Sequence, residues 1–225
     1  MMDTTKIRRM AGTMTVLLAI AGSCAAEDKK VELKLELPKP QFQGTPTPIK
    51  LPNLEPIEAE KPAFMVPEGV INLAKGKTVT SSESFPLLGE LAMVTDGDKE
   101  GRDGSYVELG PGKQWAQIDL GVPCEIFAIA MWLYHSQPRA YHDVVIQVSD
   151  DADFVQNVTT IYSNDHDNSS GFGIGKDLAY VESYKGRIID AKGVKARYVR
   201  INSRGNTSDE MNHFTEVEIY GRAVK

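Results

Sequence analysis

The sequence predicts an all-β protein built as an antiparallel β-sandwich. Three segments with alternating side chains carry this prediction: QWAQIDLG at 114–121, ARYVRIN at 196–202 and TEVEIYG at 215–221. In the first segment, Ala116, Ile118 and Leu120 point to one side and polar or aromatic residues to the other. A period of two is typical of a strand that lays one face on a core.

The first 26 residues have the order of a secretory signal peptide. Lys6, Arg8 and Arg9 precede an apolar run at 14–21, and small residues follow at 22–26. The apolar run is too short to span a bilayer as a permanent helix. We therefore expect an exported protein, at the cell surface, in the periplasm or outside the cell.

The sequence leaves two ways of processing this signal open. Ala21-Gly22-Ser23-Cys24 resembles a bacterial lipobox, in which the cysteine is acylated, although a larger aliphatic residue is usual in place of Ala21. The alternative is ordinary cleavage after Ala26. In either case Cys124 is left as the one possible free thiol, so the fold depends on its core and a buried, inert Cys124 is expected.

Residues 27–69 are predicted to form a Pro-rich linker, extended or disordered. The segment holds eight of the twelve prolines of the chain. Because proline fixes the backbone and has no N–H to donate, this composition excludes a helix or a central strand. An extended spacer between an export signal and a domain is the role that this composition favours.

Residues 70–225 are predicted to form one sandwich domain around a single core. The segment at 126–134 is apolar on both faces, which is expected of a central strand between two layers. Val144, Ile146 and Val148 line one face of another strand. Clusters of Gly, Asp, Asn and Ser separate these short segments, and no long stretch shows a helical period.

The formal net charge of −6 argues against a nucleic-acid binder, which normally carries a basic patch. The same charge disfavours adhesion to anionic membranes. A membrane contact is therefore expected only through a lipid anchor at Cys24.

Several segments, in order, resemble the discoidin, or coagulation factor V/VIII type C, domain. They are NLAKGKTVTSS at 72–82, VTDG at 94–97, WAQIDLG at 115–121, VVIQVSDDADF at 144–154, and the closing pair ARYVRIN and TEVEIYG. The resemblance covers most of residues 71–222. It implies a jelly-roll sandwich of the galactose-binding-like class, similar to carbohydrate-binding module family 32, and a binding module rather than a catalyst.

The resemblance also implies a structural Ca²⁺ near the turn after the first strand. The matching positions in this sequence are Asp96, Asp98, Ser105 and Glu216. Hard oxygen ligands suit Ca²⁺, and a glycine between two aspartates permits a tight loop around an ion. The alternative is a solvated Asp-Gly turn with Glu216 on an exposed strand face.

Three polar loops at 134–142, 164–175 and 202–213 contain all four histidines of the chain. Loops on a rigid scaffold are the usual place for binding residues. Sugar recognition needs planar hydrogen-bond donors and acceptors together with an aromatic face. Tyr134, Tyr141 or Phe172 could supply the aromatic face. The candidate ligand-binding residues are His135, Arg139, Tyr141, His142, His166, Asp167, Arg204, Asn206, Asn212 and His213.

Two other interpretations of these loop residues stay open. Each polar residue could serve a turn, as Asn and Asp often do. The histidines could bind a transition metal, although His135 and His142 are too far apart in sequence for the usual paired zinc spacing.

Catalysis is not expected. Asp165-His166-Asp167 and the pair Glu216 and Glu218 are the arrangements that suggest acid–base chemistry, whereas a glycosidase needs two carboxylates across a cleft. The sequence has no Gly-rich phosphate loop and no serine elbow. We therefore predict an exported or surface-tethered module that binds a glycan or polysaccharide. The alternative is a structural or adhesion protein that binds another envelope protein.

Overall fold

The computed structural model describes residues 28–42, 47–56 and 62–224 of the chain. The predicted signal peptide, with Cys24, lies outside the described residues. Within the described ranges, none of the helical structure has the length and apolar character needed to cross a bilayer.

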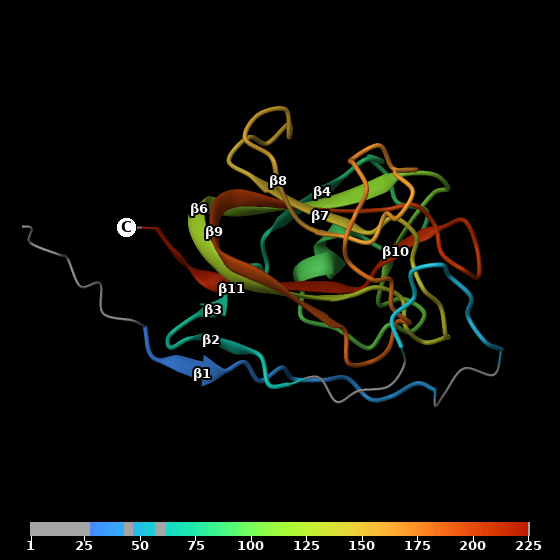
Figure 1. The fold of residues 1–225 in the computed structure, drawn as a ribbon, viewed down its shortest axis with the longest axis horizontal. Coiled ribbons are helices and arrows are strands. Elements are labelled where there is room, and N and C mark those ends of the chain that lie inside the picture. The colour runs from blue at the N-terminus through green and yellow to red at the C-terminus, as the bar shows by residue number, and fades with distance from the viewer. Residues whose placement is uncertain (1–27, 43–46, 57–61, 225) are drawn as a thin grey trace, which may run out of the picture.

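The described residues form strands and one short 3-10 helix (Figure 1). They are β1 (Lys30–Glu32), β2 (Met65–Pro67), β3 (Ile71–Asn72), β4 (Thr78–Ser81), η1 (Leu91–Thr95), β5 (Val107–Leu109), β6 (Gln114–Trp132), β7 (Val145–Ser149), β8 (Thr159–Ser163), β9 (Arg187–Ser203), β10 (Asn212–Phe214) and β11 (Glu216–Ala223). Seven of these strands form the main sheet in the order β3-β11-β6-β9-β7-β8, with β4 also paired to β6. The predicted antiparallel β-sandwich is confirmed.

The two layers of the sandwich arise because β6 and β9 run through both of them. The first part of β6 pairs with β4 and its second part pairs with β11, while β9 follows it on the other side. The register of β6 against β9 shifts between Asp119 and Cys124, where the exposed residues 121–123 carry the chain from one layer to the other. Gly121 has a φ of 86°, a conformation that glycine adopts without steric cost.

The core lies between the two layers. Ile118, Ile129, Val199 and Phe214 are among its fully buried side chains, and the segment at 128–133 is buried on both faces as expected of a central strand. Cys124 is a buried free thiol whose pKa burial raises, so the thiol is the stable form.

The Pro-rich segment is extended, and its described parts lie along the sandwich rather than apart from it. Within the segment, β1 pairs antiparallel with β2. Toward the sandwich, the backbone oxygen of Glu36 accepts a hydrogen bond of 3.0 Å from Lys99 Nζ. Arg222 forms an ion pair of 2.8 Å with Asp28. The chain before residue 70 is therefore in contact with the domain at several points, which a free spacer would not be.

Candidate functional site

Two loops meet at one end of the sandwich, residues 133–144 after β6 and residues 204–211 between β9 and β10. His142 N–H donates to Gly205 O at 3.0 Å, and Thr207 N–H donates to the backbone oxygen of Ala140 at 2.9 Å. These backbone hydrogen bonds hold the two loops together. Side chains on them are consequently presented by a rigid support, as a binding site requires.

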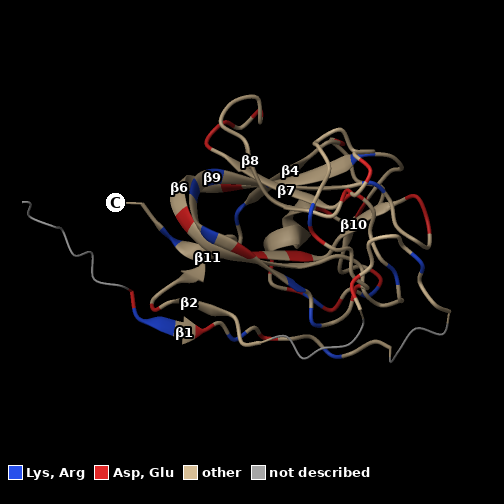
Figure 2. Cartoon of the chain, viewed as in Figure 1, with Lys and Arg blue, Asp and Glu red and all other residues tan. Residues whose placement is uncertain are grey.

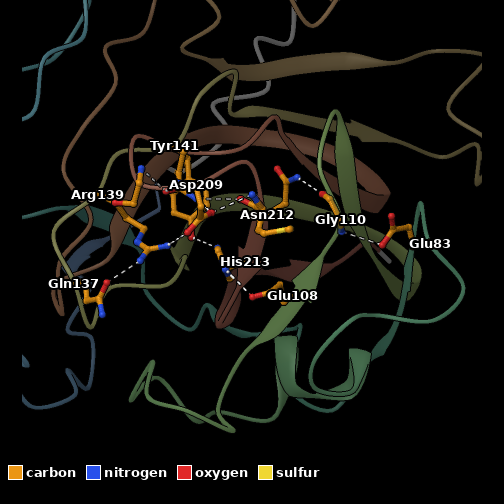
Figure 3. A network of polar contacts seen from close by, with 12 residues as sticks. Glu83, Glu108, Gly110, Gln137, Arg139, Tyr141, Asp209, Asn212 and His213 are labelled. Carbon is orange, nitrogen blue, oxygen red and sulfur yellow. Dashed lines mark hydrogen bonds and ion pairs between the residues drawn. The ribbon is translucent and has the colours of Figure 1, made fainter.

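A network of polar contacts lies behind these loops (Figure 3). Arg139 donates to Asp209 at 3.0 Å and to Gln137 at 3.2 Å, and its guanidinium lies 4.5 Å from the centre of the Tyr134 ring. The Arg139 side chain is only 5% exposed. Because it is buried and bonded to two loop residues, Arg139 supports the loops rather than presenting itself to a ligand.

His213 joins this network to β5. Its Nδ1 lies 2.8 Å from the Tyr141 hydroxyl and its Nε2 lies 3.1 Å from a Glu108 oxygen (Figure 3). Burial lowers the pKa of His213 and raises that of Tyr141 well above its ordinary value. Both side chains are therefore neutral at pH 7, as buried groups held by hydrogen bonds tend to be.

The ten predicted ligand-binding residues separate into two groups. Six have buried side chains: His135, Arg139, Tyr141, Asn206, Asn212 and His213. His142 is half-buried, while His166, Asp167 and Arg204 are exposed. In this structure, only the second group is available to a ligand without rearrangement.

The buried group holds backbone and side-chain partners, which explains its burial. Asn212 donates from Nδ2 to Gly110 O and Gly112 O, and its Oδ1 accepts from Ser203 and Gly205. Such an amide satisfies the backbone of several turns at once. The sequence pattern of polar loop residues does not distinguish this role from ligand binding.

A pocket of about 470 Å³ opens between the loop end and the Pro-rich segment. One side consists of Pro138, His142 and residues 206–208, and the other side consists of residues 47–51. The second side was not predicted. A signal for it exists in the sequence, because Ile49, Leu51 and Leu54 place apolar side chains at intervals in an otherwise polar and Pro-rich stretch.

A smaller cavity of about 20 Å³ adjoins this pocket and is lined in part by His142, Asp143 and His166. Near it, carboxylate oxygens of Asp143, Asp165 and Asp167 lie within 4.8 Å of one another. Asp143 accepts from the Ser169 hydroxyl at 2.7 Å and Asp165 accepts from the amides of residues 169 and 170. These carboxylates therefore stabilise the loop. No histidine belongs to such a cluster in the described part of the chain.

The four predicted calcium ligands gather around the turn that follows η1. Asp98 N–H donates to Asp96 Oδ1 at 2.7 Å, Ser105 Oγ donates to Asp98 Oδ2 at 2.9 Å, and Gly97 N–H donates to Glu216 Oε2 at 3.1 Å. Glu216 is fully buried rather than on an exposed face, so a wholly solvated turn is excluded.

The Glu216 carboxyl is poorly satisfied for a buried group. Its Oε1 has no hydrogen-bond partner in the structure. Burial, together with the charges of Glu218 and Asp96, raises the pKa of Glu216 to about 8. A buried carboxyl with a partnerless oxygen beside further carboxylates fits a cation, since an ion would supply what the oxygen lacks.

Comparison with known proteins gives a family match and a fold. Residues 93–201 match the F5/F8 type C family model described as "NedA-like, galactose-binding domain". A family 89 glycoside hydrolase from Clostridium perfringens aligns with a TM-score of 0.50 and 20% identity, over 68% of this chain and 15% of that chain. No match is found among curated proteins.

Smaller binding modules align as well. A chitosan-binding module from a Paenibacillus sp. IK-5 chitosanase/glucanase has a TM-score of 0.45 and 23% identity, over 67% of this chain and 99% of that chain. A fucose-binding module from Streptococcus pneumoniae has a TM-score of 0.47 and 21% identity, over 67% and 97% of the two chains. The family match covers residues 93–201 of the sandwich, and the antiparallel fold of these residues agrees with a galactose-binding-like domain.

Proposed function

We propose that this protein is a non-catalytic binding module that takes a glycan in the pocket at its loop end. The pocket of about 470 Å³ is the observation that carries the proposal. It offers the imidazole of His142 and the hydroxyls of Thr207 and Ser208 beside the apolar surface of Pro138, and the buried Asn206 supports this wall. Hydroxyl-rich ligands need this mixture of planar polar groups and apolar surface, and the volume is within the range of small-ligand sites.

The test is binding of the mature protein to a broad array of glycans and polysaccharides, with His142→Ala as the site variant. Lys195→Ala is the matched control, because Lys195 is an exposed residue of β9 outside the pocket. We expect selective binding that His142→Ala weakens and Lys195→Ala leaves unchanged. A folded protein that binds no member of the array would contradict the proposal and favour the alternative, recognition of another envelope protein.

We further propose that the turn at 96–98 holds a structural Ca²⁺, with Glu216 and Asp96 as carboxylate ligands. Support comes from the buried Glu216 oxygen without a partner and from the raised pKa of this carboxyl. Asp98 and Ser105 hydrogen-bond to each other and would shape the turn around the ion. Isothermal titration calorimetry with CaCl₂, on protein from which Ca²⁺ has been removed with a chelator, tests this proposal. Absence of binding at millimolar Ca²⁺ would contradict it.

Export is proposed on the order of residues 1–26, which lie outside the described residues. Mass spectrometry of protein recovered from the cell envelope tests it. An N-terminus at an acylated Cys24 would identify a lipid anchor, an N-terminus at Glu27 would identify simple cleavage, and an unprocessed Met1 would contradict export.

A further inference from the structure

Residues 47–56, here called the strap, are docked on the domain through their second half. Glu55 N–H donates to Ala179 O at 2.8 Å, and Ala179 N–H donates to Asn53 O at 3.0 Å. The Asn53 side chain adds a hydrogen bond of 2.7 Å to Asn164 O. In Figure 1 the strap is the cyan segment that crosses the end of the sandwich near β10.

An ion pair reinforces this docking. Nη1 of Arg187 lies 2.8 Å from both carboxylate oxygens of Glu55. The two side chains are 14% and 22% exposed, and the Arg187 guanidinium also lies 4.6 Å from the centre of the Tyr180 ring. A pair that is shielded from water and held against an aromatic ring is stronger than an exposed surface pair.

The first half of the strap faces the ligand pocket. Ile49 and Leu51 are half-buried, whereas Lys50 between them is exposed, and all three line the pocket opposite His142 and residues 206–208. Residues 53–55, which are docked on the domain, thus fix the position of residues 47–51, which border the pocket. Because space remains between the strap and the loops, the strap forms a wall and does not fill the site.

The charge of this pocket differs from that of the whole protein. The net charge of the chain is −6, yet neither Asp nor Glu is among the residues that line the pocket, while Lys50 and His142 are. Two acidic groups on the pocket loops have basic partners, since Asp209 pairs with Arg139 at 3.0 Å and Asp143 lies 3.7 Å from Arg204. The carboxylate cluster that contains Asp143 borders the smaller cavity, not the pocket itself. Among the described residues that line the pocket, Lys50 is the one Lys, Arg, Asp or Glu side chain, and its ammonium group favours an anionic ligand.

We infer that the strap is part of the binding site, and that Lys50 makes the site selective for sugar units that carry a carboxylate or sulfate. The inference rests on the proposed glycan function and names its ligand class. It assigns a recognition role to a segment whose composition suggested only a spacer.

The experiment compares four proteins on an array that presents neutral and acidic polysaccharides with related backbones, such as galactan with polygalacturonate. They are the wild type, Lys50→Gln, the strap-release variant Asn53→Ala/Glu55→Ala, and Lys34→Gln. The last is the matched control, since it removes an exposed lysine from the same N-terminal segment away from the pocket. Hydrogen exchange at the amides of Glu55 and Ala179 reports docking of the strap independently of any glycan.

We expect the wild type and Lys34→Gln to prefer the acidic member of each pair. Lys50→Gln should lose about threefold to fivefold in affinity for acidic members at low salt, the range of one exposed charge contact. The strap-release variant should exchange faster at both amides and bind both members about tenfold more weakly, because one wall is lost.

Three results would overturn the inference. A wild type that prefers neutral members, or that shows equal affinity for both, removes the role of the charge. If the strap-release variant loses binding while Lys50→Gln binds as the wild type does, the charge of Lys50 likewise has no role. Unchanged binding in a variant whose strap amides exchange faster shows that the strap is packing only. A wild type that binds no glycan is a failure of the proposed function itself, recognisable because strap docking stays intact by hydrogen exchange.

Discussion

Glu216 is the residue at which burial and charge conflict most clearly. Its folded-state pKa of about 8 is above the ordinary value near 4.5, so the folded protein binds more protons than the unfolded chain between these values. In the presence of a chelator, the contribution of Glu216 to the free energy of unfolding is therefore fully present below pH 4.5 and is lost as the pH rises through 8. Ca²⁺ would compensate the charge that burial disfavours.

We predict that Glu216→Gln, an uncharged carboxyl mimic, flattens this dependence. In EDTA the variant should lose about 1–3 kcal/mol less than the wild type between pH 5 and pH 8, since each unit of pKa shift is worth about 1.4 kcal/mol. Added Ca²⁺ should raise the Tm of the wild type at pH 8 and leave that of the variant unchanged. Urea and thermal unfolding measure both effects. Equal responses of the two proteins to Ca²⁺ would show that Glu216 is not a ligand.

Arg139 and His142 are close in sequence but differ in what their replacement should do. Arg139→Ala removes a buried guanidinium together with its hydrogen bonds to Gln137 and to Oδ2 of Asp209, so we predict a loss of about 2–4 kcal/mol in the free energy of unfolding. His142→Ala, at a half-buried position, should cost less than about 1 kcal/mol.

Urea unfolding of both variants checks this difference, and a cost for Arg139→Ala as small as that for His142→Ala would contradict the supporting role. This difference in stability decides how a loss of binding is interpreted in each variant. Weak binding by Arg139→Ala would reflect damaged loops, whereas weak binding by a stable His142→Ala would identify a contact with the ligand.

At the scale of elements, the alternating patterns predicted the strands but not how they join. The segments at 114–121 and 126–134 are predicted as separate strands, whereas the first and all but the last two residues of the second belong to the single 19-residue strand β6. Their division was sensible, because exposed Gly121, Val122 and Pro123 interrupt the pattern. Strand β9 joins the two segments, because it pairs with β6 on both sides of the bend. This pairing connects parts of the chain that are about 80 residues apart, and it leaves no periodic signal in the sequence of either strand.

The same limit applies to the loops. Their polar composition predicted a functional end of the sandwich, and the pocket is at that end. Which polar residues line it depends on which ones the turns use, as Asn212 and His213 show. Only His142 and Asn206 of the predicted ligand-binding residues line the pocket, because hydrogen-bond partners from β5 and the loop after it take up others.

A glycine in β11 tests how closely β11 approaches β6. Gly221 lies where the register of β11 against β6 shifts, and a Cβ at this position would be 2.3 Å from the backbone oxygen of Glu125. Backbone cannot yield as a side chain can, so Gly221→Ala should destabilise the protein by about 2–4 kcal/mol.

Gly76→Ala is the control for this substitution, because nothing lies within 4 Å of its Cβ position and its φ of 67° costs only about 1–2 kcal/mol. Urea unfolding decides between the two. A smaller effect at Gly221 than at Gly76 would mean that β11 can move away from β6 without cost.

At the scale of the whole molecule, the N-terminal strand and the pocket lie at opposite ends of the sandwich. The described N-terminal strand β1 and the C-terminus lie at one end of the long axis, and the strap and β10 lie at the other (Figure 1). Acidic and basic residues are interspersed along the described chain rather than gathered on one basic face (Figure 2). If the chain is anchored near its N-terminus, the pocket would consequently face away from the membrane.

The N-terminal segment reaches from one end to the other, so its removal should affect both stability and binding. Deleting the residues before 70 removes two ion pairs, Arg222 with Asp28 and Arg187 with Glu55. The deletion further removes the hydrogen bond from Lys99 to the backbone oxygen of Glu36. It also exposes surface now covered by Val66, which is buried. We predict that the 70–225 fragment unfolds about 4–8 °C below the 28–225 chain, the shift that about 2 kcal/mol produces in a domain of this size.

Differential scanning calorimetry of the two proteins measures this shift, with binding to the same glycan measured in parallel. The fragment should bind more weakly even at temperatures where it is fully folded, because the pocket then has only its loop side. Equal Tm values would mean that the contacts of the N-terminal segment merely offset the cost of ordering it. Equal affinities at equal foldedness would show that the loops alone make the site, and that the segment serves only to carry the domain.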